Sequence, residues 1–432
     1  MLDSSDPGCV SGDTEFLTPT GWKRIDQYVP GDMVAQFHPH VAEIEFVEPI
    51  AYVKEPCAEM IEIAPVRGTS QLLSPEHRVL WYGPNEEFGE QSAESFMREL
   101  HKRGGGHMRK KFMTAMHTAA TNTTGMSEAE LRVQVAFVAD GHMAAKTPGS
   151  LGTIRVKKTR KVERLHKLLQ DARIQYRHRT QPSTGFTIFR FTPPRHFKHF
   201  PAAYHALKQK ELCIIGDEAT HWDGSFDPRP SSGRRFSSMV KTDADIVQLA
   251  WAALGASTSN HWTEHGGYQV HASLKQLVGP GRKEAVRVVP SPDGYKYCFT
   301  VPSTYLYLRR NGYPFATGNT GKTRVQIELF AARRKRGGGA ALVGRRRRPL
   351  DARQRRHRHR GGGGGAHRRR HLRGLQAPGA GALRGVPRAP RLPARQHHPF
   401  AARPGSRTRF RCWQRPAIGG MSDAVHDAHF NQ

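Results

Sequence analysis

The residues best suited to covalent chemistry are a cysteine near the start of the chain, Cys9, and an adjacent pair much later, Asn319 and Thr320. A thiol can attack the carbonyl that precedes it, which would convert the Gly8–Cys9 amide into a thioester, a better acyl donor. The Thr320 hydroxyl can then accept the acyl group, and Asn319 can cyclise on its own backbone carbonyl and release the branch. This combination predicts that residues 9–319 excise themselves and join their flanks.

The two flanks form a phosphate-binding loop when residues 9–319 are deleted. They join as Asp-Pro-Gly-Thr-Gly-Lys-Thr, in which backbone N–H groups would cradle phosphates, the Lys would reach the terminal phosphates and the Thr would hold Mg2+. Ser5 stands where the full motif has its first Gly. The residues expected to bind ATP and Mg2+ in the joined host are Gly8, Gly321, Lys322 and Thr323. Residues 1–8 and 320–343 therefore look like fragments of a helicase-like P-loop ATPase of phage or actinobacterial type.

The sequence around both joints resembles an intein of the Hint fold, a protein-splicing domain. The resemblance covers about three quarters of the chain, and its motifs occur in the family's order. The first splicing block is matched by 9–16, 21–25 and 30–32, the TxxH block by Ser-Pro-Glu-His at 74–77, and the last two blocks by 298–303 and 312–319.

The resemblance implies a role for each matched residue, with the chain's own flanks (exteins) as substrate and no cofactor. At the upstream joint, Cys9 would be the first nucleophile, His77 would protonate or distort the Gly8–Cys9 amide, and Ser74 would hydrogen-bond the same amide. At the downstream joint, Thr320 would be the second nucleophile and Asn319 would cyclise. Gly312 would serve a turn. Two positions depart from the family pattern. Gly318 stands where most inteins have a His that assists cyclisation, and Cys298 stands where the family often has Asp, so that it either tunes the second step or packs.

The elements that must position these residues are β-strands at both ends of the insert. Short apolar or alternating runs at 34–37, 60–63 and 78–81 are punctuated by Gly, Pro and Asp, which indicates a β-rich part. The β pattern returns at 285–289 and 297–301. With the resemblance, this predicts a multidomain protein whose all-β, horseshoe-like Hint domain combines residues 9–120 with residues 271–319.

Between these ends the pattern changes to an α/β insertion. Amphipathic helices are expected at 161–174 and 244–255, and strands rich in Lys, Arg and Thr at 153–159, 186–192 and 234–241. Two segments, 133–141 and 211–225, each read as an apolar helix that ends in a carboxylate followed by Gly. Pairing of these helices through small residues such as Ala136 and Ala219 would bring Asp140 and Asp223 together. Close carboxylates favour a bridging divalent metal, which suits phosphodiester hydrolysis.

Residues 121–270 resemble a LAGLIDADG homing endonuclease with both repeats in one chain. The resemblance implies αββα repeats, a double-stranded DNA partner (the homing site in a host gene that lacks the insert), and Mg2+ bound by Asp140 and Asp223. Lys157, Lys158 and Lys241 stand where such folds line the DNA surface. The alternative for each of these lysines is an ordinary solvated strand charge.

The formal charge of +30 is concentrated at the end of the chain. Residues 324–432 hold about 27 Lys and Arg but only about 4 Asp and Glu. From 344 onward the low-complexity Arg, Gly, Pro and His runs lack the apolar residues of a core, so a disordered basic tail is predicted. One hypothesis is a coding region read in the wrong frame, and the other is a genuine nucleic-acid-binding tail.

No run approaches the roughly 20 apolar residues of a membrane helix, and the start lacks signal-peptide features, so we expect a cytoplasmic monomer without a membrane partner. The five cysteines are scattered and lack a CxxC pair, which argues against a disulfide framework or a zinc site. We expect Cys57 and Cys213 to pack as small hydrophobes.

Two further functional hypotheses compete with splicing. In one, the host ATP-binding protein is the functional entity and the insert is inert. In the other, a Hint-type domain cleaves the chain without ligating it, although this would leave Asn319 and Thr320 together without a use. The masses of the products distinguish the three.

Overall fold

A computed structural model describes residues 8–66, 68–84, 87–102, 109–143, 149–222, 224–226, 233–273 and 275–318. All of them belong to one compact unit. Asp223, Asn319 and Thr320 lie outside the described residues, as do Gly321, Lys322 and Thr323, which were predicted to bind nucleotide, and the basic tail. Within the described residues, no helix is long and apolar enough to cross a membrane.

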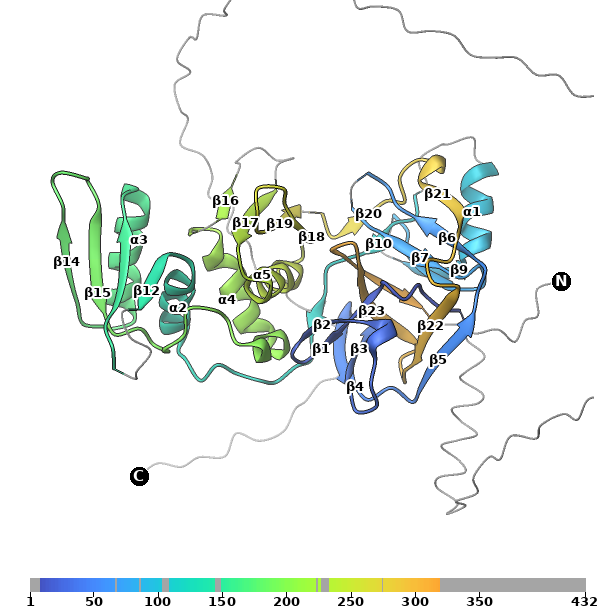
Figure 1. Ribbon diagram of the computed structural model, residues 1–432, viewed down its shortest axis with the longest axis horizontal. Coiled ribbons are helices and arrows are strands. Elements are labelled where there is room, and N and C mark those ends of the chain that lie inside the picture. The colour runs from blue at the N-terminus through green and yellow to red at the C-terminus, as the bar shows by residue number, and fades with distance from the viewer. Residues whose placement is uncertain are drawn as a thin grey trace, which may run out of the picture. The chain divides into compact units, whose positions relative to one another are not determined.

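The largest sheet combines strands from both ends of the insert. Its strand order is β11-β4-β3-β23-β1-β2, and β24 pairs with β23. The strands are β1 (Glu15–Thr18), β2 (Gly21–Arg24), β3 (Val34–His38), β4 (Glu43–Val47), β11 (His117–Thr118), β23 (Tyr305–Arg310) and β24 (Tyr313–Gly318). In Figure 1 the orange-brown β22 and β23 lie among the blue strands β1 to β5. Strands from both ends of the insert therefore share one β-rich part.

Smaller sheets and one helix complete this β-rich part. They pair β5 (Ala51–Pro56) with β22 (Tyr295–Thr300), β6 (Glu59–Ile63) with β7 (Gln71–Leu73) and β21 (Val286–Pro290), β8 (Arg78–Tyr82) with β9 (Phe88–Ser92), and β10 (Phe112–Met113) with β20 (Leu277–Val278). The helical elements are α1 (Ala93–Lys102) and the 3-10 turns η1 (Ile25–Gln27) and η3 (Lys283–Ala285). A core that includes Phe16, Phe299 and Phe315 joins residues from both ends of the insert.

The middle of the chain folds as two halves with the same topology. The first contains α2 (Glu128–Asp140), β12 (Gly141–Met143), β13 (Gly152–Val156), α3 (Thr159–Asp171), β14 (Tyr176–Thr180) and β15 (Thr187–Phe191). The second contains α4 (Gln209–Ala219), β16 (Gly224–Phe226), β17 (Arg234–Ser238), α5 (Lys241–Ala253), β18 (Ser257–Trp262) and β19 (Tyr268–Ser273), and η2 (Ala202–Ala206) precedes it. The sheet orders, β12-β13-β15-β14 and β16-β17-β19-β18, are equivalent. This internal repeat agrees with the expected α/β insertion.

The first helix of each half shows how far sequence patterns define an element. A capping box at Ser127 and Glu130 starts α2, which ends at Asp140 as expected. The second apolar helix was expected over 211–225, but α4 ends at Ala219. The Thr220 hydroxyl bonds back to the Gly216 carbonyl, so the last turn is closed before Trp222.

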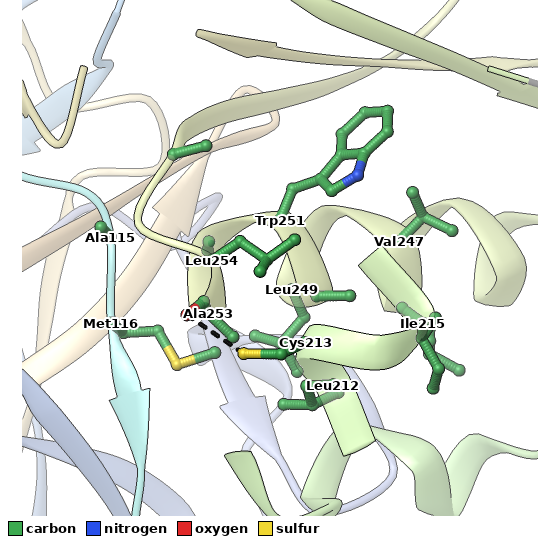
Figure 2. Packing of buried hydrophobic residues seen from close by; sticks show 14 of the residues in the cluster. Ala115, Met116, Leu212, Cys213, Ile215, Val247, Leu249, Trp251, Ala253 and Leu254 are labelled. Atoms are coloured by element: carbon green, nitrogen blue, oxygen red, sulfur yellow. Dashed lines mark hydrogen bonds between the residues drawn. The ribbon is translucent and has the colours of Figure 1, made fainter. Parts of the chain in front are cut away.

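Helix α4 packs against both α2 and α5. Figure 2 shows Cys213 of α4 beside Ala253 at the end of α5, and the Cys213 thiol donates to the Ala253 carbonyl. A side chain at Gly216 would collide with Leu254 and the Ala250 carbonyl, so the glycine allows α4 to lie close to α5 at this point. Cys213 is thus a core residue, as expected.

A turn of the β-rich part docks on the second half. Asn311 and Gly312 both have positive φ, as an Asn-Gly hairpin between β23 and β24 requires, which confirms the expected turn. The Gly312 carbonyl accepts from the Asn260 backbone N–H (3.0 Å) and the Gln248 amide (2.8 Å). A side chain at Gly312 would strike the Asn260 carbonyl, so this contact also requires glycine.

Candidate functional site

The upstream joint, which is the bond between Gly8 and Cys9, lies between β7 and β22, two strands that are far apart in the sequence. The Val10 and Tyr297 backbones exchange both hydrogen bonds, each 2.8 Å. On the other side, the Ser11 N–H donates to the Leu72 carbonyl (3.1 Å) and the Ser74 N–H donates to the Cys9 carbonyl (2.9 Å). Residues 9–11 therefore form the middle of a short antiparallel ribbon between residues 72–74 and 296–298.

This register decides which side chains meet. Residues directly opposite each other in antiparallel strands project to the same face, and alternate residues of one strand share that face. Cys9, Ser74 and Cys298 therefore form one row, with Lys296 on the same face. All four are buried: Cys9 is 0% exposed, Ser74 1%, Cys298 2% and Lys296 4%. Two thiols, a hydroxyl and an ammonium group are thus enclosed together.

The amide between Gly8 and Cys9 lies beside two polar side chains, Ser74 and His77. Its N–H, that of Cys9, donates to Ser74 Oγ at 2.9 Å. The Gly8 backbone lies near the His77 ring and favours its protonated form, as an acceptor such as the Gly8 carbonyl does, although the buried His77 Nδ1 has no hydrogen-bond partner among the described residues.

His77 is fully buried and held by a second contact. Its backbone N–H donates to the Ser74 carbonyl (3.0 Å), and its Nε2 lies 2.7 Å from the Thr317 hydroxyl. Burial lowers the pKa of His77 from its usual 6.5 to about 3, although the nearby Gly8 backbone works in the opposite direction. The imidazole is therefore neutral at pH 7 and offers one N–H and one acceptor nitrogen.

The Cys9 thiol is kept protonated by its surroundings. A side-chain hydrogen bond with Cys298 and burial both raise the pKa of Cys9 well above its usual range, whereas the charge of Lys296 lowers it. Lys296 Nζ is in turn bound to Glu76 (2.8 Å) and Glu55 (3.6 Å). Attack by this sulfur therefore requires removal of its proton during the step.

The downstream joint follows directly from strand β24. Thr317, whose hydroxyl contacts His77, is two residues before Asn319 in the sequence. A side chain at Gly318 would come within 3.1 Å of the Arg78 carbonyl and Cβ, so the expected His has little room at this position.

Two residues of this site were missed by the sequence analysis. Lys296 could have been found from strand alternation, because it is two residues before Cys298. Thr317 carried no local signal, since its importance depends on a contact with His77, which is 240 residues away in the sequence. Cys57, expected to pack, is partly exposed and donates to the Glu59 carbonyl.

One sheet of the insertion presents an exposed basic face. The register places Arg177 opposite Arg190, and Arg155 and Arg179 both opposite Ile188, so these four arginines share a face and all are exposed. The other face carries buried apolar residues such as Ile154, Phe189 and Phe191. On the equivalent face of the second sheet, Arg235 is the only arginine among the described residues, accompanied by His271 and Ser259.

The three lysines predicted for DNA binding occupy different surroundings. Lys157 Nζ lies 5.8 Å from the centre of the Phe186 ring, beside Arg155 on the same ring, and Lys158 precedes α3. Lys241 begins α5, where its Nζ bonds to Asp245 (2.6 Å) and lies 3.9 Å from Glu15. Lys157 therefore belongs to the basic face, whereas Lys241 is engaged by two carboxylates.

The predicted metal ligands are described only in part. The Asp140 carboxylate, at the end of α2, is paired with Lys161 Nζ. A carboxylate already neutralised by an ammonium group is a weak ligand for a divalent cation on its own, so Asp140 alone does not fit a Mg2+ site. No cluster of three or more His, Cys, Asp or Glu suited to a metal occurs among the described residues. Nearby, Glu218 is fully buried and bound by Arg132, Arg164 and Trp222.

No family model matches the chain, and no curated protein sequence does. Among solved structures, it is similar to a splice-inactive variant of the AceL NrdHF class 3 split intein, with 21% identity over 28% of this chain and 67% of that one, at a TM-score of 0.21.

The chain is also similar to the homing endonuclease I-DmoI in complex with DNA and Mn, with 15% identity over 34% of this chain and 90% of that one, at a TM-score of 0.26. It is also similar to DUF199/WhiA from Thermatoga maritima, with 8% identity over 35% of this chain and 53% of that one, at a TM-score of 0.26. At such TM-scores, functional conclusions must rest on the geometry of the site itself.

Proposed function

We propose that residues 9–319 form a Hint-type intein that excises itself and ligates its flanks. The observation that carries the proposal is that Ser74 accepts a hydrogen bond from the N–H of the Gly8–Cys9 amide at 2.9 Å, while the fully buried His77 ring lies near the Gly8 backbone. A nucleophile adjoins the same bond. An inert insert has no need of a buried thiol, hydroxyl and neutral imidazole around one peptide bond.

In the first step, Cys9 Sγ attacks the Gly8 carbonyl carbon and its proton passes to the departing Cys9 nitrogen. The neutral His77 supports the oxygen of the tetrahedral intermediate with its N–H, the role of an oxyanion-hole donor. Ser74 holds the amide in place. The C–N bond then breaks, which leaves Gly8 as a thioester on Cys9 and a free amino group on the same residue.

In the second step, the Thr320 hydroxyl attacks the thioester and Cys9 regains its thiol. Asn319 then cyclises: its side-chain nitrogen attacks its own carbonyl carbon, the Asn319–Thr320 bond breaks, and the insert leaves with a terminal succinimide. The ester between Gly8 and Thr320 rearranges to an amide. Cys298 adjoins Cys9 throughout, a position from which it can influence the second step.

We further propose that the insertion is a LAGLIDADG-type DNA endonuclease. The two matching α/β halves and the exposed arginine face support DNA as the partner, because arginine side chains on an open sheet can bind phosphates. Lys157, Lys158 and Lys241 remain predicted DNA-binding residues. Asp140 and Asp223 remain the predicted acids, and Mg2+ the predicted ion.

The host proposal rests on the sequence alone. Joining Gly8 to Thr320 completes a loop with Gly321, Lys322 and Thr323, as in a P-loop ATPase or helicase. The joined product would bind ATP and Mg2+, whereas the unspliced chain lacks a continuous loop.

Mass analysis of the chain after expression tests the splicing proposal. Splicing gives an excised insert and a ligated product, cleavage alone gives unligated fragments, and an inert insert leaves the chain intact. Thr320→Ala should permit cleavage at Gly8–Cys9 but abolish ligation. If ligated product still forms after this substitution, the proposed second nucleophile is wrong.

Cleavage of DNA is tested separately. A plasmid that carries the host gene without the insert should be linearised when Mg2+ is present, and Asp140→Asn should abolish this reaction. An equally active Asp140→Asn variant would contradict the assignment of this acid.

A further inference from the structure

The strongest unassigned feature is the pairing of two thiols across the upstream joint. Val10 and Tyr297 exchange both backbone hydrogen bonds, so they are the hydrogen-bonded pair of this ribbon. The next residues, Cys9 and Cys298, are therefore a directly opposed pair without mutual backbone hydrogen bonds. In such pairs the Cα atoms lie about 4.5 Å apart and the side chains are closest. Disulfides span Cα distances of about 4.4–6.8 Å, and a pair at this position of the register falls within that range.

The side chains are also placed for bond formation. Both thiols project to the same face, both are buried, and they share a hydrogen bond. The other described cysteines are not alternatives: Cys57 follows β5 and contacts the Glu59 carbonyl, and Cys213 lies in α4 against Ala253. None of the four described cysteines is in a disulfide. The structure therefore selects one pair.

We propose that Cys9 and Cys298 are a modification site that forms an intramolecular disulfide with a small-molecule disulfide as oxidant. One of the two thiols, as thiolate, attacks the oxidant RSSR, which gives a mixed disulfide and one RSH. The second thiolate attacks the protein sulfur of that mixed disulfide and displaces the second RSH. Two cysteine thiols are oxidised, one RSSR is reduced, and each attacking thiol gives its proton to a departing thiolate.

The surroundings set the rate of this exchange. The bond to Cys298 and burial raise the pKa of Cys9 and so disfavour the thiolate, the Lys296 ammonium opposes this only in part, and burial also restricts access of the oxidant. Uncatalysed disulfide exchange takes minutes to hours even at accessible sites. The pair should therefore respond to sustained oxidation and not to a brief pulse.

Disulfide formation would inactivate the upstream joint. The Cys9 sulfur would be bonded to Cys298 and could not attack the Gly8 carbonyl. This consequence rests on the proposed splicing function, whereas formation of the bond itself does not. Reduction by a dithiol would restore the nucleophile, so the modification acts as a reversible block.

The bond is tested on the full chain carrying Asn319→Ala and Thr320→Ala, which cannot complete splicing. After incubation with glutathione disulfide, remaining thiols are alkylated and peptides are mapped without reduction. We expect a peptide that links Cys9 to Cys298, a mass lower by two hydrogen atoms, and reversal by dithiothreitol. Cys57→Ser should retain the linked peptide and Cys298→Ser should lose it. A stable glutathione adduct on Cys9, or no linked peptide in the folded chain, would overturn the proposal.

Hydroxylamine reports the consequence, because it cleaves a thioester at Gly8 and releases residues 1–8. The reduced chain should be cleaved, the oxidised chain should not, and dithiothreitol treatment should restore cleavage. If the linked peptide forms and cleavage is unchanged, Cys9 is not the nucleophile and the proposed splicing function fails, while the disulfide stands. If the reduced chain is cleaved but no linked peptide forms, the disulfide proposal fails alone.

Discussion

The upstream joint and the exposed arginine face of the first α/β half differ in how their polar side chains are arranged: those at the joint are buried around one bond, and those on the sheet are exposed. At the joint, Cys9, Ser74 and His77 are enclosed, and each touches the same peptide bond or its neighbour. On the sheet, Arg155, Arg177, Arg179 and Arg190 are exposed and act through screened charge. A reaction at a buried site depends on every side chain around the reacting bond, whereas the electrostatic attraction of an exposed charged face is the sum of many small contributions. Substitutions should therefore have large effects at the joint and small, additive effects on the sheet.

The largest expected effect is that of Cys9→Ala. Without a thiol no thioester forms, and we expect complete loss of the ligated product and of the excised insert by mass analysis. Cys57→Ser is the matched control, because Cys57 lies away from the joint, and it should splice normally. Normal ligation by the Cys9→Ala chain would show that another residue is the first nucleophile and that the upstream joint does not depend on Cys9.

A smaller effect is expected from Thr317→Val, which keeps the shape of the side chain but leaves the His77 Nε2 without its hydroxyl partner. An unsatisfied buried polar group costs about 1–3 kcal/mol, which corresponds to a rate reduction of roughly 5- to 160-fold if the loss falls on the transition state. Hydroxylamine cleavage at Gly8 measures this step. Thr317→Ser restores the hydroxyl and should recover most of the rate; equal rates for the Val and Ser variants would show that the contact only fills space.

The neutral state of His77 predicts a pH dependence of stability. Its pKa is about 3 in the folded chain and 6.5 as an ordinary side chain, so the unfolded chain binds the proton more readily. The stability associated with the neutral ring is complete above pH 6.5 and is lost as pH falls from 6.5 towards 3. Urea unfolding followed by tryptophan fluorescence should show this decline, and His77→Gln should reduce its slope. An unchanged slope of stability against pH would mean that other titrating groups cause the loss of stability at low pH.

The sequence predicted elements well where the signal is local. The runs at 34–37 and 60–63 became β3 and β6, and the amphipathic pattern at 161–174 became α3, because alternation and helical periodicity are local consequences of burial. The end of α4 was misplaced because the apolar pattern continues through Trp222, which packs in the core outside the helix. The thiol pair could not be predicted, since it depends on the register between residues 10 and 297, which no local pattern specifies.

The smallest effects should come from single arginines of the sheet. Removing Arg177 should weaken binding to double-stranded DNA only a few-fold and reduce the slope of log affinity against log salt concentration by about 1, because one phosphate contact is lost. Fluorescence anisotropy at several salt concentrations measures both. The control Arg98→Ala removes an exposed arginine of α1, which is paired with Glu94 in the β-rich part, and should leave both unchanged. Arg235→Ala tests the second sheet in the same way. If it reduces DNA affinity more than Arg177→Ala does, DNA is bound mainly by the half with fewer charges, and contacts to bases contribute more than attraction to phosphates.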